Sequence, residues 1–176
     1  MFQIGDLIIY GNEGVCKVIE IGVPDIFVDE GDDRMYYTLE PVYKRGTVYT
    51  PVDTSVFMRH IISREEALNL INEIPHISDD IIENRNIRVL SEEYEKSIRS
   101  HDCTDLLRLI KSVHHKRKVM NDRGKKLGQV DEKFFKRAEE LLHGEFAVAL
   151  NIPKEEVGNF ISDRIEKLST GAENAV

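Results

Sequence analysis

One stretch of the chain is rich in the side chains that bind phosphate. Residues 108–137 contain eleven Lys or Arg and only three Asp or Glu. Ammonium and guanidinium groups neutralise nucleic-acid phosphates and release their counterions, whatever the base sequence. A soluble helix face is the plainer interpretation of a charge run, but the imbalance between the two signs makes it less attractive. The stretch therefore predicts binding to a nucleic-acid backbone.

A smaller group of cations precedes this stretch. Arg85 and Arg88 are three residues apart, a spacing that places two side chains on one face of a helix. The two groups could meet in a compact helical domain. No pattern of bidentate base-reading side chains accompanies them, so we expect backbone contact or shape recognition instead of a sequence code.

The rest of the chain is acidic. Its 176 residues carry a net charge of −8. Residues 1–74 hold six Lys or Arg against thirteen Asp or Glu, and residues 75–176 hold eighteen against nineteen. A negative total normally argues against a nucleic-acid partner, but a local cluster produces a local field.

No arrangement typical of an active site is found in the sequence. A P-loop, a GxGxxG motif and a GxSxG motif are all missing, and no nucleophile, base and orienting group come together. His101, Cys103 and His114 match no zinc-binding spacing. We therefore expect no catalytic residue, metal site, cofactor or small-molecule substrate, and the protein is predicted not to be an enzyme.

Signals for secretion or membrane insertion are not found in the sequence. No apolar run reaches the roughly 18 residues of a membrane helix. Residues 1–6 lack the basic and apolar regions of a signal peptide. Cys16 and Cys103 lie far apart, and no disulfide is expected. We expect a cytoplasmic protein without membrane contact.

The first sixty residues predict short strands. Apolar and polar residues alternate, and turns rich in Gly and polar residues separate the runs, with a polar tip at 29–33. Pro51 has no backbone N–H, so strand 47–52 either lies at a sheet edge or simply ends at this proline. Such a pattern is typical of a small antiparallel barrel or a strongly bent sheet. The expected strands are 7–10, 15–21, 35–40, 47–52 and 56–62.

The remaining residues predict helices. Ser63 and Glu66 have the spacing of a capping box, and Pro75 ends the helix that they begin. Ser78-Asp79-Asp80 is expected to cap a second helix. Its apolar stripe is Ile87, Leu90, Tyr94 and Ile98, and a break follows at 101–104. Three further helices follow: one up to a loop at 121–128, one opening at Asp131, and one from Pro153 to Leu168.

These elements predict an α+β protein with an N-terminal antiparallel β-barrel and a C-terminal all-helical bundle. The domain boundary is expected in the short helix that ends at Pro75, because the strand pattern stops before it and the long helices begin after it. The expected division is a β domain at 1–62, a connecting helix at 63–75, a helical domain at 76–168 and a flexible tail at 169–176.

Three segments, in this order, resemble the CarD/CdnL family of bacterial transcription regulators. The first is FQIGDLIIY at 2–10, followed by GVC at 14–16. The second is TVYTPVD at 47–53. The third is GKKL at 124–127, followed by DEK at 131–133 and AEELLHGEFA at 138–147. The resemblance covers about residues 1–168.

The resemblance implies a function. The family's N-terminal domain is a Tudor-like barrel, also found in the transcription–repair coupling factor, and it adds a strand to a strand of the RNA polymerase β subunit. The matching residues here are Thr47, Val48, Tyr49, Thr50 and Pro51. A proline in place of Thr50 is expected to remove an edge N–H group. The family's helical domain contacts promoter DNA upstream of the bubble and stabilises the open complex, without catalysis.

The chain departs from the family pattern in lacking tryptophan, which many relatives insert into the minor groove. Ile82 or Ile87 could take this position, because an apolar wedge can unstack a base step. The helical spacing of Ile87, however, predicts a place in the core. The residues expected to contact DNA are Arg85, Ile87, Arg88, Lys116, Arg117, Lys118, Arg123, Lys125, Lys126, Lys133 and Arg137.

A second hypothesis uses the same basic stretch without any polymerase. A small β domain with a basic helical tail is also typical of RNA- or ribosome-associated proteins. Such a protein would bind RNA at least as tightly as duplex DNA, and it would not co-purify with polymerase.

Overall fold

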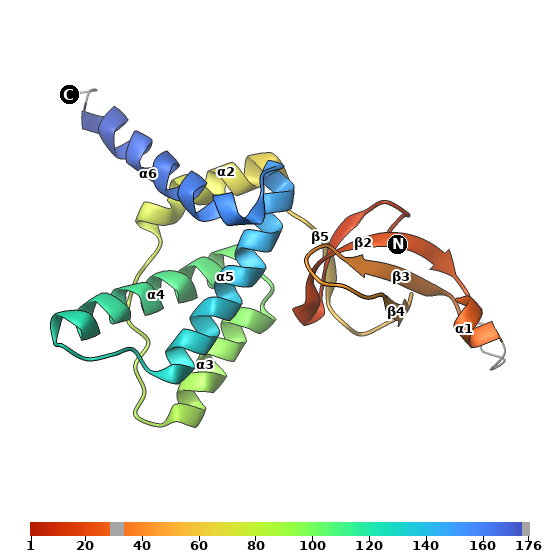
Figure 1. Cartoon of the computed structure of the whole chain (residues 1–176), viewed down its shortest axis with the longest axis horizontal. Coiled ribbons are helices and arrows are strands. Elements are labelled where there is room, and N and C mark those ends of the chain that lie inside the picture. The colour runs from red at the N-terminus through yellow and green to blue at the C-terminus, as the bar shows by residue number, and fades with distance from the viewer. Residues whose placement is uncertain (29–33, 174–176) are drawn as a thin grey trace. The chain divides into compact units, whose positions relative to one another are not determined.

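The computed structural model describes residues 1–28 and 34–173 (Figure 1). The polar tip expected at residues 29–33 lies outside these ranges. The chain divides into two compact units, Met1–Ile61 and Ile62–Val176. The first unit contains a sheet and the second contains helices, so the expected α+β class is confirmed.

The first unit, called the sheet unit below, is built from five antiparallel strands in the order β4-β3-β2-β1-β5. Glycines at positive φ allow the tight β1–β2 connection, where Gly14 has φ 86°. One side of the sheet packs around the buried side chains of Ile8, Cys16, Val18, Tyr37 and Leu39. The strands are β1 (Leu7–Tyr10), β2 (Gly14–Gly22), β3 (Tyr36–Pro41), β4 (Val48–Pro51) and β5 (Met58–His60), with a 3-10 turn η1 (Gly11–Glu13) and a short helix α1 (Asp25–Val28).

The sheet is open in the part of the chain that the structure describes. β4 pairs only with β3, β5 pairs only with β1, and no ladder joins β4 to β5. The closed barrel that the sequence predicted is therefore not confirmed. The edge position expected for strand 47–52 is confirmed. Pro51 is also the last residue of β4, so both interpretations of this proline apply.

The second unit, called the helical unit below, contains five α-helices. Tyr94, Leu142 and Phe146 are among the largest side chains of its core and are almost fully buried. The capping box is confirmed, because Ser63 Oγ accepts from the Glu66 N–H and the Glu66 carboxylate accepts from the Ser63 N–H. The elements are α2 (Arg64–Glu73), η2 (Ile74–His76), α3 (Ile87–Arg99), α4 (Cys103–Asp122), α5 (Gln129–Leu150), η3 (Lys154–Glu156) and α6 (Val157–Glu173).

Three expected helix boundaries are wrong. Ser78 does not cap a helix, because its Oγ accepts from the Asp80 N–H in a local turn and α3 begins only at Ile87. Gln129, two residues before Asp131, is the first residue of α5. The last helix continues to Glu173, beyond the expected end at Leu168. Among the described helices, none has the length and apolarity needed to cross a membrane.

A buried carboxylate fixes the start of the helical unit. Glu145 on α5 is only 2% exposed. It accepts a hydrogen bond from the Ile62 N–H at 2.9 Å and another from the Cys103 thiol at 3.3 Å. Burying a carboxylate without hydrogen-bond partners would reduce the free energy of unfolding. These bonds therefore connect the segment before α2 to α4 and α5.

Candidate partner-strand and nucleic-acid interfaces

In the part of the chain that the structure describes, the edge of β4 that faces away from β3 carries backbone groups of Tyr49 and Pro51. The Val52 N–H donates to the Met35 carbonyl at 3.0 Å, which makes residues 35 and 52 a hydrogen-bonded pair. Such pairs alternate along an antiparallel ladder. With Thr50 opposite Tyr37 and Tyr49 opposite Thr38, Thr50 bonds to β3 while Tyr49 and Pro51 direct their backbone groups outward. Tyr49 thus offers an N–H and a carbonyl, and Pro51 offers a carbonyl.

This register corrects the expectation for Thr50. Its N–H points toward β3, and its side chain is only 2% exposed. A proline at this position would break the pairing of β3 with β4 instead of altering the free edge. The edge N–H belongs to Tyr49, whose side chain is also exposed.

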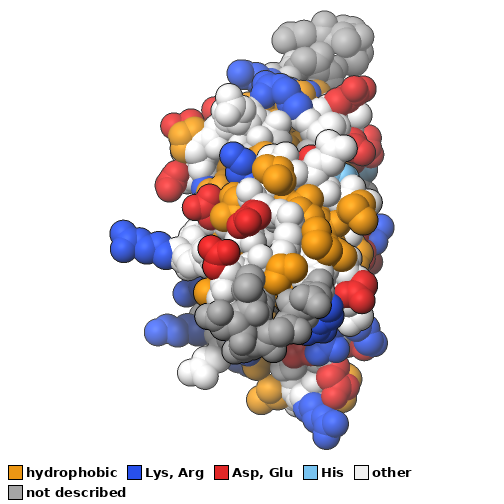
Figure 2. All heavy atoms as spheres, turned by 90° about the vertical axis from the view of Figure 1, so that its right-hand side faces the viewer, with side chains coloured by type: hydrophobic (Ala, Val, Ile, Leu, Met, Phe, Trp, Pro, Cys, Tyr) orange, Lys and Arg blue, Asp and Glu red, His pale blue; other side chains and the backbone are white. Residues whose placement is uncertain are grey.

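Apolar side chains are exposed on the sheet unit. Figure 2, which looks onto this unit, shows several hydrophobic side chains gathered on one face. The exposed apolar residues of the unit include Tyr49 on β4 and Val56 and Phe57 before β5. Such side chains supply the apolar contact that accompanies backbone pairing at a strand-addition surface.

The helical unit exposes an isoleucine at the first residue of α3. Ile87 is 65% exposed, so the predicted core position is wrong. Asn86 caps the helix, with its Oδ1 accepting from the Arg88 N–H at 3.0 Å. Arg85 therefore precedes the helix and does not share a helix face with Arg88, contrary to the sequence-based expectation. The side chains of Arg85, Ile87 and Arg88 are all exposed.

Ile82, the other candidate for an apolar wedge, is placed differently. Its side chain is partly buried and packs against the core of the helical unit. Its N–H donates to Ser112 Oγ on α4 at 3.0 Å. Of the two isoleucines, Ile87 is the one whose side chain is available to a partner.

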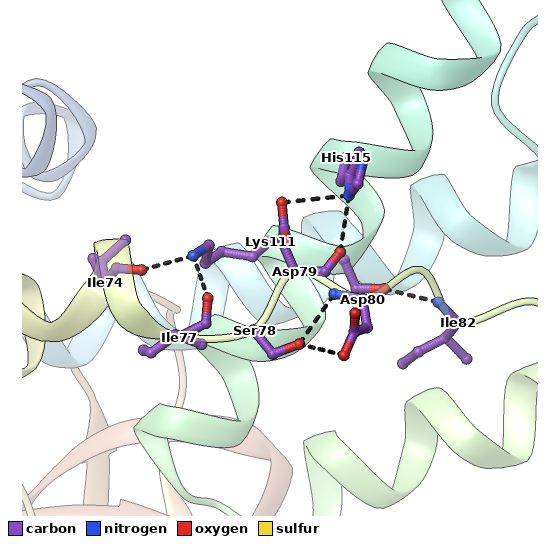
Figure 3. Close-up of polar contacts among 9 residues, drawn as sticks. Ile74, Ile77, Ser78, Asp79, Asp80, Ile82, Lys111 and His115 are labelled. Carbon is purple, nitrogen blue, oxygen red and sulfur yellow. Dashed lines mark hydrogen bonds and ion pairs between the residues drawn. The ribbon is translucent and has the colours of Figure 1, made fainter.

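Residues 77–86, which we call the strap, connect η2 to α3 and are held by side chains of α4 (Figure 3). Lys111 Nζ donates to the carbonyls of Ile74, at 2.7 Å, and Ile77. His115 Nδ1 lies 3.0 Å from the Asp79 carbonyl and 3.3 Å from its Oδ2. Lys111, one of the eleven cations, thus has a structural role.

Lys116 also has an ion-pair partner inside the helical unit. Its side chain is 13% exposed, and its Nζ lies 2.8 Å from Oδ1 of the buried Asp131. The Tyr94 hydroxyl donates to the same oxygen at 2.6 Å. Burial and this hydrogen bond raise the pKa of Tyr94 well above its usual range. Lys116 therefore does not belong to the exposed basic surface expected from the sequence.

Three more cations have acidic partners. The Arg117 guanidinium lies 4.3 Å from the centre of the Phe135 ring and pairs with Glu132 at 3.1 Å. Arg137 pairs with Glu140 at 2.9 Å, and Arg108 pairs with Asp105 at 2.9 Å. The positive field of the stretch is therefore smaller than its count of cations implies.

The remaining basic side chains gather around the connection between α4 and α5. Gly124, at φ 67°, ends α4 with its N–H donating to the Asn121 carbonyl, while the Lys125 N–H donates to the Met120 carbonyl. This cap orders the segment that carries two exposed lysines. Exposed cations with no recorded ion pair among the described residues are Lys118, Arg123, Lys125, Lys126, Lys133 and Lys136.

The sheet unit matches a known domain family. Residues 2–62 match the family described as the CarD-like/TRCF RID domain. A comparison with curated proteins found no match to the chain. The matched residues include all five strands, with the free edge at β4. The chain thus carries a CarD-like/TRCF RID domain at residues 2–62, which confirms the family resemblance of its N-terminal motifs.

Proposed function

We propose that the protein is a non-enzymatic, cytoplasmic regulator of transcription initiation. Its RID domain binds the RNA polymerase β subunit, and its helical unit contacts promoter DNA upstream of the bubble. Holding both at once stabilises the open complex. The observation that carries this proposal is the position of β4 at the edge of the described sheet, within a matched RID domain.

Polymerase binding uses β-strand addition. A partner strand bonds to the outward N–H and carbonyl of Tyr49 and to the carbonyl of Pro51. The exposed Tyr49 side chain then lies beside the new strand and adds apolar contact. Thr47 precedes the strand, and the carbonyl of Val48 bonds inward to Leu39 in this register, so residues 49 and 51 provide the main backbone contacts.

DNA contact uses the exposed start of α3 and the basic connection between α4 and α5. Ile87 is the residue that we assign to the base step at the bubble edge, where an apolar side chain can partly unstack the bases. Arg85 and Arg88 lie next to it in sequence and bind the adjacent phosphates. Five exposed cations contact the backbone without reading its sequence: Lys118, Arg123, Lys125, Lys126 and Lys133.

Weak DNA contact is sufficient because the protein is tethered. Once the RID domain is bound to polymerase, the promoter DNA is present at a high effective concentration near the helical unit. A small set of backbone contacts can then lengthen the life of the open complex, although the same contacts would bind free DNA poorly.

The test replaces Tyr49 by proline, which removes the edge N–H, and by alanine, which keeps it. We expect Tyr49→Pro to weaken binding of the full chain to core RNA polymerase by about tenfold or more, and Tyr49→Ala to have a smaller effect. Affinity is measured by titration, and the melting temperature confirms that both variants fold. Unchanged affinity of Tyr49→Pro would contradict the proposal, as would RNA binding tighter than duplex-DNA binding in a chain that does not bind polymerase.

A further inference from the structure

A basic notch lies at the connection between β3 and β4. Its volume is about 500 Å³, and the residues around it include Lys17 on β2, Glu40 and Val42 at and after the end of β3, and Lys44, Arg45 and Gly46 in the connection. The next strand after Gly46 is β4, the free edge of the sheet.

The notch concentrates positive charge in an acidic unit. Residues 1–61 contain five Lys or Arg against ten Asp or Glu, and three of those five cations line the notch. Lys44 pairs with Glu13 at 2.9 Å. Lys17 and Arg45 have no ion pair recorded within residues 1–28 and 34–173. Because Lys17 lies directly opposite Glu40 in the β2–β3 ladder, Arg45 is the notch cation whose charge is most available to a partner.

The connection that carries Arg45 is anchored at its first half. The Val42 N–H donates to the Val15 carbonyl at 3.0 Å, and the Lys44–Glu13 ion pair joins the connection to η1. Gly46, at φ 117°, allows the chain to turn toward β4. A partner thus meets a partly ordered site, which lowers the entropic cost of binding.

We propose that this notch receives an acidic side chain of the RNA polymerase β subunit, next to the strand that pairs with β4. The inference rests on the proposed function, because it requires strand addition at β4. A partner strand that continues past Val48 runs toward residues 44–46, so a carboxylate flanking that strand can approach Arg45 and the notch that it lines. The notch favours a partner with a negative side chain, while the edge of β4 supplies backbone hydrogen bonds.

A protein carboxylate fits the notch better than a nucleic-acid backbone. The surrounding unit carries an excess of Asp and Glu, which repels a chain of phosphates over its whole length. Glu40 also lines the notch, but it repels a phosphate and a carboxylate alike and so does not distinguish them. A single carboxylate meets less of the repulsion from the surrounding unit than a chain of phosphates does, and Arg45 can bind it through two hydrogen bonds.

The experiment measures binding of the full-length variants Arg45→Glu and Lys17→Glu to core RNA polymerase over a range of salt concentrations. We expect each variant to bind about five- to twentyfold more weakly at low salt, with a flatter dependence of affinity on salt. Arg59→Glu on β5 is the matched control, since it makes the same charge change at the opposite edge of the sheet, and should change affinity less than twofold.

Two results would overturn the inference. One is an unchanged affinity and salt dependence of the notch variants while Tyr49→Pro abolishes binding, which would leave the proposed function intact. The other is a loss of duplex-DNA affinity in the notch variants with unchanged polymerase affinity, which would assign the notch to nucleic acid. Failure of Tyr49→Pro to weaken binding would instead contradict the proposed function itself.

Discussion

Ile87 lies in the first turn of α3, where its spacing with Leu90 and Tyr94 predicted a core position. The structure buries Leu90 and Tyr94 but leaves Ile87 65% exposed. Periodicity identifies the face of a helix but does not show where along the helix the neighbouring elements stop. The first residue of α3 is not packed against the core of the helical unit, so its apolar side chain remains available to a partner.

Substitutions of Ile87 and Ile82 distinguish an effect on DNA binding from an effect on the stability of the fold. We expect Ile87→Ala to change the free energy of unfolding by less than about 0.5 kcal/mol, because the site is exposed, and to shorten the open-complex lifetime severalfold. We expect Ile82→Ala to destabilise the protein by about 1–2 kcal/mol, since its side chain is partly buried. Chemical denaturation and promoter-complex decay measure the two effects. An unchanged decay rate for Ile87→Ala would remove Ile87 from the DNA interface.

Lys116 shows what composition cannot reveal about a basic stretch. In the sequence it is followed by Arg117 and Lys118, and all three were expected to contact DNA. The structure gives Lys116 a buried partner in Asp131, gives Arg117 a partner in Glu132, and leaves Lys118 exposed. These partners are fifteen residues away in the chain, so only the packing of α4 against α5 could identify them.

At the scale of elements, strand β4 was predictable and the strap was not. Alternation, turn residues and Pro51 predicted this strand from local sequence, but they left open whether it lies at an edge, which the strand order shows. The strap was interpreted as the first part of a helix because Ser78-Asp79-Asp80 has the residue types of an N-cap. Its backbone instead bonds to Ser112 and His115, across 30 and 36 residues of the chain, so no local pattern could indicate these contacts.

The strap has a testable role in positioning α3. Ser112→Ala removes the acceptor of the Ile82 N–H. We expect faster hydrogen exchange at residue 82 and a shorter open-complex lifetime, with polymerase affinity unchanged, because a looser strap no longer fixes the start of α3. Ser162→Ala, the same change at an exposed serine of α6, is the control. Unaltered exchange at residue 82 would show that the strap is fixed without Ser112.

The contact of α5 with α6 predicts a pH dependence. Burial of His143 on α5 lowers its pKa below the ordinary value. The nearby Glu139 carboxylate opposes this effect in part, and the charge of Lys154 adds to it. The folded state therefore binds fewer protons than the unfolded state, so stability is full above the ordinary histidine pKa of about 6.5 and falls as the pH drops toward the folded pKa. We expect urea denaturation at pH 7 and pH 5.5 to show this loss, and His143→Gln to reduce it. An equal loss in the variant would assign the effect to other groups.

At the scale of the whole molecule, both units carry a net negative charge, but the edge strand and the basic stretch at 108–137 belong to different units. The sheet unit is acidic and presents a strand edge, whereas the exposed cations near the α4–α5 connection belong to the helical unit. The family resemblance identified the first unit and its edge strand from the sequence. The residues of the proposed DNA surface could be chosen only from the structure, because the structure shows which cations have acidic partners inside the helical unit.

This division predicts how combined variants behave. Replacing Lys125, Lys126 and Lys133 by Glu should leave polymerase affinity unchanged and weaken binding to duplex DNA. The logarithmic salt slope should fall by up to about 3, since each lost phosphate contact removes about 0.9. Titrations of duplex DNA at several salt concentrations measure this slope. Equal loss of polymerase and DNA affinity would contradict the division.

A mixture of this triple variant with Tyr49→Pro decides whether the two activities must reside in one chain. The triple variant keeps the β4 edge and Tyr49→Pro keeps the three lysines, so the mixture contains both surfaces. We expect the mixture not to restore the open-complex lifetime, because DNA contact depends on the effective concentration created by a tether to polymerase. The unaltered protein is the positive control in the same promoter assay. Restoration by the mixture would mean that the helical unit binds promoter DNA without being tethered.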